Sequence, residues 1–230
     1  YAMKTSSIEY TIRHAQEPLG EPSANSIHSM WNDAEIAEIS CFQLRGSSFR
    51  PQSQVRLLYD NHFLAVLFSV QDHYVRAVAK QWNDSVCRDS CVEFFVAPSD
   101  EPDKDDYFNF EINCGGTMLL YHCPGSAGGK RGHVSADEGA EIRISTTMPK
   151  IVEPEIQTPT DWCVEYHVPW SLFHNHFGIE IPQSGTSWRG NFYKCGDATS
   201  HPHWASWAPL DTFAGGFHQP KYFQPLYFNT

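Results

Sequence analysis

The chain has 230 residues, of which 41% are hydrophobic and 14% aromatic, and its formal charge is −11 at neutral pH. This composition is that of a globular protein with a sizeable core. A net negative charge excludes nucleic acid and anionic membranes as partners, since both need clustered Lys and Arg. No apolar run approaches the roughly 20 residues of a membrane span.

The first residues, YAMKTSSIEYTIRHA, lack the apolar core of a secretory signal. This favours a cytoplasmic protein, or a periplasmic or secreted one if a leader has been removed. The seven cysteines form no Cys-x-x-Cys pair, so we expect most of them to be reduced and buried. An oxidised pair of Cys87 and Cys91 is the alternative.

Period-two alternation and turn residues predict strands along the chain. In chain order these are 55–60, 62–72, 91–98, 107–113, 117–122, 141–148, 161–170, 187–196 and 222–228. We expect residues 124–140, rich in Gly and Ser, to form a mobile loop, and 170–177 to form a helical turn capped by Ser171. The sequence therefore predicts an all-β, jelly-roll-like antiparallel β-sandwich with one or two short helical turns, as a single domain over residues 1–230.

Two of these strands carry polar side chains on one face. In CVEFFVAP, Glu93 points away from the face of Val92, Phe94 and Val96, which we assign to the core. In YFNFEIN, the corresponding face carries Asn109, Glu111 and Asn113. If the two strands pair, these carboxylates and amides converge with Glu93.

Such a surface is suited to sugar hydroxyl groups, since carboxylates accept hydrogen bonds and amides both donate and accept them. Flat aromatic side chains nearby would suit the apolar face of a sugar ring, and the candidates are Trp82, Trp204, Trp207, Phe213 and Phe217. The structural alternative is a solvated sheet face with the aromatics in the core. A second alternative is a glycoside-processing enzyme, in which Glu93 and Glu111 form the catalytic carboxyl pair.

A haem- or metal-binding sandwich is the remaining alternative. The candidate zinc ligands are Cys87, Cys91, His122 and Cys123, or His201, His203 and His218, although neither spacing matches a standard zinc motif. The candidate calcium ligands are Asp84, Asp89, Asp100, Asp103, Asp105 and Asp106.

Several segments resemble carbohydrate-binding module family 9, and more closely its stand-alone branch in bacteria that degrade polysaccharides. They are SMWNDAEIAEISCF, WNDSVCRDSCVEFFVAP with YFNFEINCGG, and WRGNFYKCGDATSHPHWASWAPL leading to FHQPKYFQPLYF. The resemblance covers nearly the whole chain, with 124–140 as the main unmatched part. It implies a β-sandwich that binds sugars at chain ends, with structural calcium and no catalysis.

The resemblance also implies a set of ligand-binding residues. Phe217 and either Trp82 or Trp204 would stack on the sugar, and the polar contacts would come from Glu93, Glu111, Asn113, Lys194 and His218. The sequence departs from the family at the first stacking tryptophan, where it has Val86 and Cys87. It departs also at Glu111, where a basic residue is usual, and at Phe217, where Trp is usual. We expect Phe217→Ala and Glu93→Ala to remove binding with little change in melting temperature.

Overall fold

The computed structural model describes residues 8–125 and 129–230. Its strands are β1 (Tyr10–His14), β2 (Ala37–Glu38), β3 (Cys41–Phe42), β4 (Gln52–Tyr59), β5 (Phe63–Ala77), β6 (Cys91–Ala97), β7 (Tyr107–Asn113), β8 (Met118–Cys123), β9 (Gly132–His133), β10 (Arg143–Thr146), β11 (Val152–Pro169), β12 (Ser187–Cys195), β13 (Trp204–Ser206) and β14 (Gln224–Asn229). None of the described helices is long and apolar enough to span a membrane.

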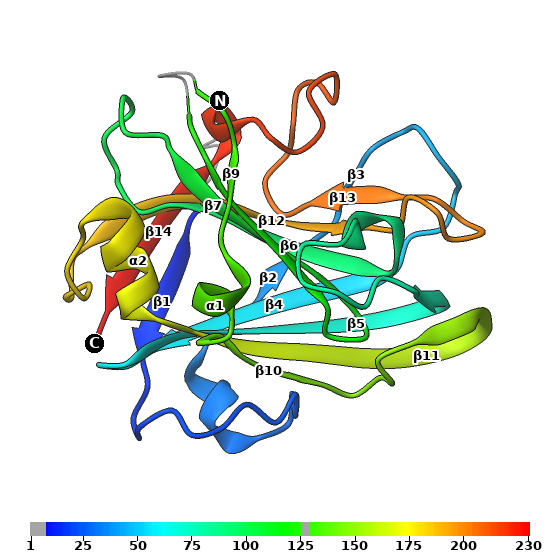
Figure 1. Cartoon of the computed structure of the whole chain (residues 1–230), viewed down its shortest axis with the longest axis horizontal. Helices are drawn as coiled ribbons and strands as arrows, with labels where there is room; N and C mark the ends of the chain where they lie inside the picture. Colours follow the sequence, from blue (N-terminus) through cyan, green and yellow to red (C-terminus); the bar gives the residue numbers. More distant parts are fainter. Residues whose placement is uncertain (1–7, 126–128) are drawn as a thin grey trace, which may run out of the picture.

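The strands form one curled sheet that folds back on itself into two layers (Figure 1). Its order is β10-β11-β5-β4-β1-β14-β12-β6-β7-β8-β9. The predicted β-sandwich is confirmed, but the expectation of a purely antiparallel sheet is wrong, because β1 pairs in parallel with both β14 and β4. This first strand lies between β4 and β14, where the sheet passes from one layer to the other.

The helical segments are short. They are α1 (Ala136–Gly139), α2 (Trp170–Phe177) and the 3-10 turns η1 (Ser29–Asp33), η2 (Val86–Arg88) and η3 (Pro220–Tyr222). The predicted Ser171 cap is wrong: β11 runs directly into α2, so the extended Pro169 is the cap, and Ser171 donates a hydrogen bond to Glu141. The predicted loop 124–140 contains β9 and α1, and its residues 126–128 lie outside the described part of the chain.

Both faces of β6 are buried, which decides where the site lies. Val92, Phe94 and Val96 enter the core between the layers, and Phe94 stacks on Phe192 with ring centroids 5.0 Å apart. The opposite face of β6 joins a second apolar cluster with Tyr193, Phe217 and other residues of the C-terminal segment. The outer face of this layer is therefore covered by the chain between β13 and β14 and is not an open, solvated sheet.

Candidate binding site

Strand register brings the predicted acidic residues together. Glu93 on β6 pairs with Glu111 on β7, and on its other side with Tyr193 on β12. One step along the same face, Cys91 pairs with Cys195. Directly opposed side chains on one sheet face have Cβ atoms about 5 Å apart, so these groups form one continuous floor.

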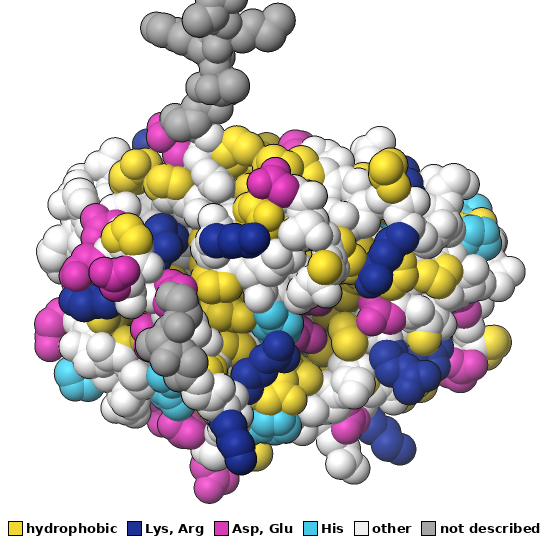
Figure 2. All heavy atoms as spheres, turned by 90° about the horizontal axis from the view of Figure 1, so that it is seen from above, with side chains coloured by type: hydrophobic (Ala, Val, Ile, Leu, Met, Phe, Trp, Pro, Cys, Tyr) yellow, Lys and Arg dark blue, Asp and Glu magenta, His cyan; other side chains and the backbone are white. Residues whose placement is uncertain are grey.

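A pocket of about 180 Å³ lies over this floor. It is lined by Arg45, Cys87, Glu93, Glu111, Cys195, Asp197, Trp204, Phe213, Gly216, Phe217 and His218. The view from above shows hydrophobic, acidic and histidine side chains meeting in hollows on this side of the molecule (Figure 2). The volume is below the roughly 300–1,000 Å³ of pockets for drug-sized ligands, so it suits a single small ring.

Aromatic side chains from the C-terminal part of the chain form the wall. Phe217 stacks on Tyr193 with ring centroids 4.2 Å apart and meets Phe213 edge-on. The guanidinium of Arg45 lies 4.3 Å from the centre of the Trp204 ring and 4.2 Å from that of Phe213. The wall therefore combines apolar ring faces with one cation, and cation–π contact holds that cation in place.

Hydrogen bonds from side chains to backbone carbonyls fix the loop that carries this wall. The Tyr193 hydroxyl donates to the carbonyl of Phe217, and the side-chain nitrogen of Gln219 donates to the carbonyls of Thr212 and Gly216. Gly216 lines the pocket with φ of 64°, a conformation that a residue with a Cβ adopts rarely. The loop is thereby pinned to the sheet at the position where Phe217 covers the floor.

Burial controls the charge of the acidic residues in the pocket. Glu93 is 3% exposed, and burial together with neighbouring Glu111 raises its pKa well above the usual value. Burial also raises the pKa of Glu111 to about 7, although the amide of Asn109 donates to its carboxylate. The pKa of Asp197 is likewise raised by burial. Near neutral pH the floor can therefore both donate and accept hydrogen bonds, because a protonated carboxyl group carries a donor.

His218 stays neutral at the rim. Burial, and then the charge of Arg131, lower the pKa of His218 to about 4. Arg131 lies 3.2 Å from Nε2 of His218, and the Tyr107 hydroxyl lies 2.8 Å from Nδ1. Because a guanidinium only donates, Nε2 is the accepting nitrogen and Nδ1 carries the hydrogen of the neutral ring.

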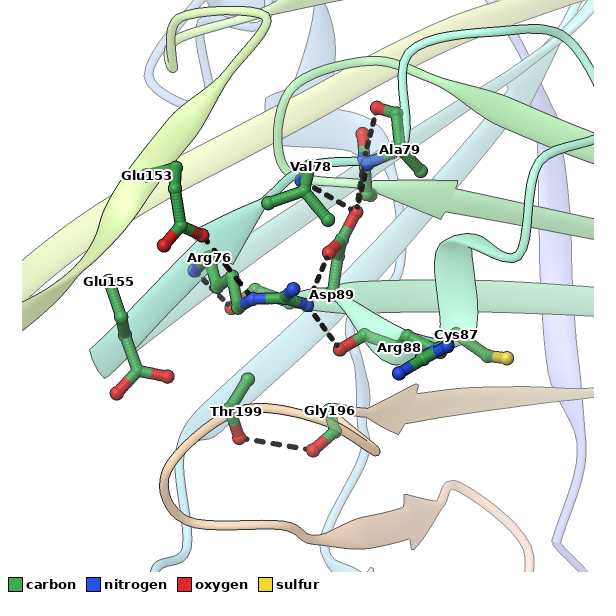
Figure 3. A network of polar contacts seen from close by, with 12 residues as sticks. Arg76, Val78, Ala79, Cys87, Arg88, Asp89, Glu153, Glu155, Gly196 and Thr199 are labelled. Atoms are coloured by element: carbon green, nitrogen blue, oxygen red, sulfur yellow. Dashed lines mark hydrogen bonds and ion pairs between the residues drawn. The ribbon is translucent and has the colours of Figure 1, made fainter.

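The opposite rim rests on a charged network beneath η2 (Figure 3). Asp89 is fully buried and accepts hydrogen bonds from Arg76, the backbone amides of Val78 and Ala79, and the side chain of Asn113. The loop after β12 docks onto the turn that this network supports. The amide of Asp197 donates to the carbonyl of Cys87, and that of Ala198 donates to the carbonyl of Arg88.

Two of the expected ligand-binding residues lie outside the pocket. Trp82 packs against the core, and its Nε1 donates to the carbonyl of Val134. Asn113 is fully buried, and its side-chain nitrogen donates to Asp89 and to the carbonyl of Ala79. Both side chains hold loops in place through these hydrogen bonds, and neither lines the pocket.

Lys194 is also outside, because it lies on the other face of β12. It pairs with Val92, whereas the neighbouring Tyr193 and Cys195 face the pocket floor. Its Nζ lies 2.9 Å from Nε2 of His203 and 3.7 Å from Oδ2 of Asp72, in the interior between the layers. The structure thus brings together Glu93, Glu111, Trp204, Phe217 and His218, and separates them from Trp82, Asn113 and Lys194.

The zinc and calcium candidates from the sequence form no group of three close side-chain ligand atoms among the described residues. Among the described His, Cys, Asp and Glu side chains, one group of three has its ligand atoms within 4.8 Å of one another, namely Cys91, Glu93 and Cys195. Neither zinc set nor the six aspartates form such a group there, and Asp89 is already saturated by donors. All seven cysteines are free, so the Cys87–Cys91 disulfide does not form. A pocket of about 180 Å³ also has no room for a haem.

Several pocket residues were not among the ligand-binding residues expected from the sequence. Asp197 lies two residues after Cys195 and continues the alternation that places Tyr193 and Cys195 on the pocket face. The sequence pattern could therefore have placed Asp197 at the pocket. Arg45 comes from a long loop, and nothing in the sequence shows where that loop lies. Phe213 was among the aromatic candidates near a sugar and does line the pocket. Cys87 and Cys195 also line the pocket, whereas the sequence predicts only that most cysteines are reduced and buried.

The fold and the pocket together define the class: a β-sandwich with a small pocket of aromatic and carboxylate side chains on the outer face of one layer. The sequence profile described as carbohydrate-binding family 9 matches residues 25–228. The chain belongs to this family. No curated protein sequence matches it significantly.

Solved structures show the same fold. A candidate carbohydrate-binding protein from Bacteroides uniformis ATCC 8492 is similar, with a TM-score of 0.84 and 26% identity over 97% of this chain and 100% of its own. A family 9 carbohydrate-binding module from Caldicellulosiruptor kristjanssonii in complex with cellotriose has a TM-score of 0.64 and 13% identity, over 96% and 94% of the two chains. The same organism's module in complex with glucose has a TM-score of 0.62 at 13% identity, over 96% of each chain.

Proposed function

We propose that this protein binds a mono- or oligosaccharide in the pocket over Glu93 and Glu111, without catalysis, as part of bacterial polysaccharide utilisation. The observation that carries this proposal is the pocket itself, a small hollow with a buried carboxyl floor and aromatic walls. Carboxyl groups bind sugar hydroxyls, and rings cover the apolar face of the sugar. Family membership and the sugar complexes of similar modules point the same way.

The size of the pocket favours a terminal sugar. About 180 Å³ holds one ring, and a second hollow of about 400 Å³ shares His218 with it. A chain end would place its last ring over Glu93 and its next ring near Tyr107 and Arg131. We propose that residues 1–230 act as one binding domain, since all strands belong to one sheet.

The enzyme alternative is less well supported by the same geometry. A glycosidase holds its two carboxyl groups on either side of the scissile bond, about 5–5.5 Å apart for retention or 6.5–9.5 Å for inversion. Glu93 and Glu111 are directly opposed on one sheet face, so both approach a bound sugar from below. That arrangement suits two carboxyl groups that hydrogen-bond hydroxyl groups of the same sugar, and not two groups on opposite sides of a scissile bond.

A thermal-shift screen tests the proposal. Chelator-treated protein is heated with mono- and disaccharides, including glucose and cellobiose, and with cello-oligosaccharides. Binding raises the melting temperature in a saturable way, because the ligand stabilises only the folded state. The affinity should be modest, because a small ligand in an open site has few contacts.

Matched variants locate the binding. Glu93→Ala should weaken the best sugar at least about tenfold, because it removes the polar group and leaves a sugar hydroxyl without its partner in the pocket. Glu38→Ala, on the exposed part of β2, should leave sugar affinity unchanged. Equal affinity of Glu93→Ala and the unaltered protein would remove the pocket from the proposal, and sugar turnover by the unaltered protein would favour the enzyme.

A further inference from the structure

Two thiols and a carboxyl group meet at the back of the pocket. Cys91 and Cys195 are paired across β6 and β12, and Glu93 lies next along the same face. The Cys195 thiol lies 3.1 Å from Oε1 of Glu93, and all three ligand atoms lie within 4.8 Å of one another. Ligands at about 2.0–2.3 Å from a zinc ion are roughly 4 Å apart, so this grouping is close to the spacing of a metal site.

Glu93 differs from the other buried carboxylates in its partners. Asp89 accepts four hydrogen bonds from nitrogen donors, and Glu165 accepts from two backbone amides and pairs with His167. Within the described residues, the hydrogen bond recorded for the Glu93 carboxyl group comes from a thiol, which is a weak donor. A buried carboxyl group so poorly supplied with donors favours a cation.

The position of the group gives an ion a way in. Glu93 and Cys195 line the pocket, and Cys91 lies fully buried behind them. An ion held by the three would keep a fourth position directed at the pocket, as in zinc sites with three protein ligands. Strand pairing on rigid β6 and β12 holds the ligands, which is the kind of support that a metal site needs.

We propose that Cys91, Cys195 and Glu93 form a binding site for a thiophilic divalent cation, with zinc as the expected ion. Two sulfur ligands select zinc over calcium or magnesium, which take oxygen ligands. Nothing in this proposal depends on sugar binding, because the site is defined by its own ligands and is tested with metal alone.

Zinc binding at this site releases protons. Burial raises the pKa of Cys91 to about 12, and the pKa of Cys195 is also raised, so without a cation both thiols keep their protons. When zinc binds, each S–H bond breaks, an S–Zn bond forms, and both thiol protons pass to the buffer. Glu93, whose pKa is also raised, gives up its carboxyl proton to the buffer and binds as a carboxylate. Affinity should therefore rise with pH, and calorimetric heats should depend on the ionisation enthalpy of the buffer.

The experiment is a calorimetric titration of reduced, chelator-treated protein with zinc alone. We expect one equivalent to bind, and cobalt in place of zinc to give a thiolate-to-metal charge-transfer band. Cys91→Ala and Cys195→Ala should each weaken zinc binding by more than the roughly 10–100-fold that loss of an outer-shell partner costs. Cys114→Ala, which removes another fully buried cysteine, is the matched control and should bind zinc like the unaltered protein.

Glu93→Gln keeps the shape of the side chain and guards against variants that fail to fold. It should retain the circular dichroism of the unaltered protein and lose the stoichiometric site. The proposal is overturned if no equivalent of zinc binds, or if zinc binding survives in Cys91→Ala and Glu93→Gln. Zinc binding without any sugar response would keep the metal site and reject the proposed sugar function, and the reverse result would do the opposite.

Discussion

Phe217 has both a structural and a binding role. It is 7% exposed and stacks on Tyr193, so Phe217→Ala should lower the free energy of unfolding by about 3 kcal/mol as well as remove sugar binding. The expectation from sequence of an unchanged melting temperature does not hold for so buried a ring. Urea unfolding and sugar titration of the same sample measure the two effects.

Phe213→Ala is the matched comparison for this prediction. Phe213 lines the same pocket but is only half-buried, so its loss should cost about 1 kcal/mol of stability. Its loss should still weaken sugar binding, because Phe213 also holds Arg45. A Phe217→Ala protein as stable as the unaltered one would show that the C-terminal loop is not packed on the sheet in solution.

At the scale of elements, η2 depends on the network around Asp89. Asp89→Asn removes the charge that pairs with Arg76 and replaces one carboxylate oxygen with a donor, which then faces either Arg76 or the amides of Val78 and Ala79. Breaking such a buried pair should cost about 3 kcal/mol. The amides of Asp197 and Ala198, which donate to carbonyls of η2, should then exchange hydrogen faster.

Hydrogen–deuterium exchange read by mass spectrometry checks this prediction. Asp161→Asn, at an exposed position of β11, is the control and should leave the exchange of residues 196–199 unchanged. Equal protection of that segment in Asp89→Asn would mean that its docking onto η2 does not depend on the Asp89 network.

Alternation of polar and apolar residues along the strands predicted the carboxyl floor of the pocket, because the floor is formed by strand residues. The pairing of Glu93 with Glu111 was predictable because both strands carry a clear apolar face. The same rule, applied to β12 with Phe192 in the core, places Lys194 in the interior, whereas the family resemblance had assigned it to the ligand. Arg45 comes from a loop whose path is fixed by tertiary contacts, so no local pattern shows its position.

At the scale of the whole molecule, a polar group behind the pocket links the two layers. Asp72 comes from β5 in one layer and Lys194 from β12 in the other, and His203 lies against Lys194. Trp162, on β11, also donates to Asp72. Because this group is buried, its protonation is coupled to the folding of the whole sandwich.

His203 should make the protein less stable in acid. Burial, then the charge of Lys194 and more weakly that of Arg50, lower the pKa of His203 to about 3, against the opposing effects of the His201 carbonyl and Asp72. The unfolded chain binds a proton to this residue near its usual value of about 6.5, so the unfolded state gains protons first as the pH falls. Its contribution to stability is therefore full above about pH 6.5 and is lost progressively toward pH 3.

The size of this loss between pH 7 and pH 5 is about 2 kcal/mol. Glu111 acts in the opposite direction over that interval, because its raised pKa of about 7 costs stability as the pH rises. Glu93 and Asp197, whose pKa values are also raised by burial, act in the same direction as Glu111. The unaltered protein shows only the sum of these effects, so the test compares it with His203→Gln. Urea unfolding at both pH values should show that His203→Gln gains about 2 kcal/mol more on acidification than the unaltered protein does. Parallel pH dependence of the two proteins would mean that His203 titrates normally in the folded state and that this interior is open to water.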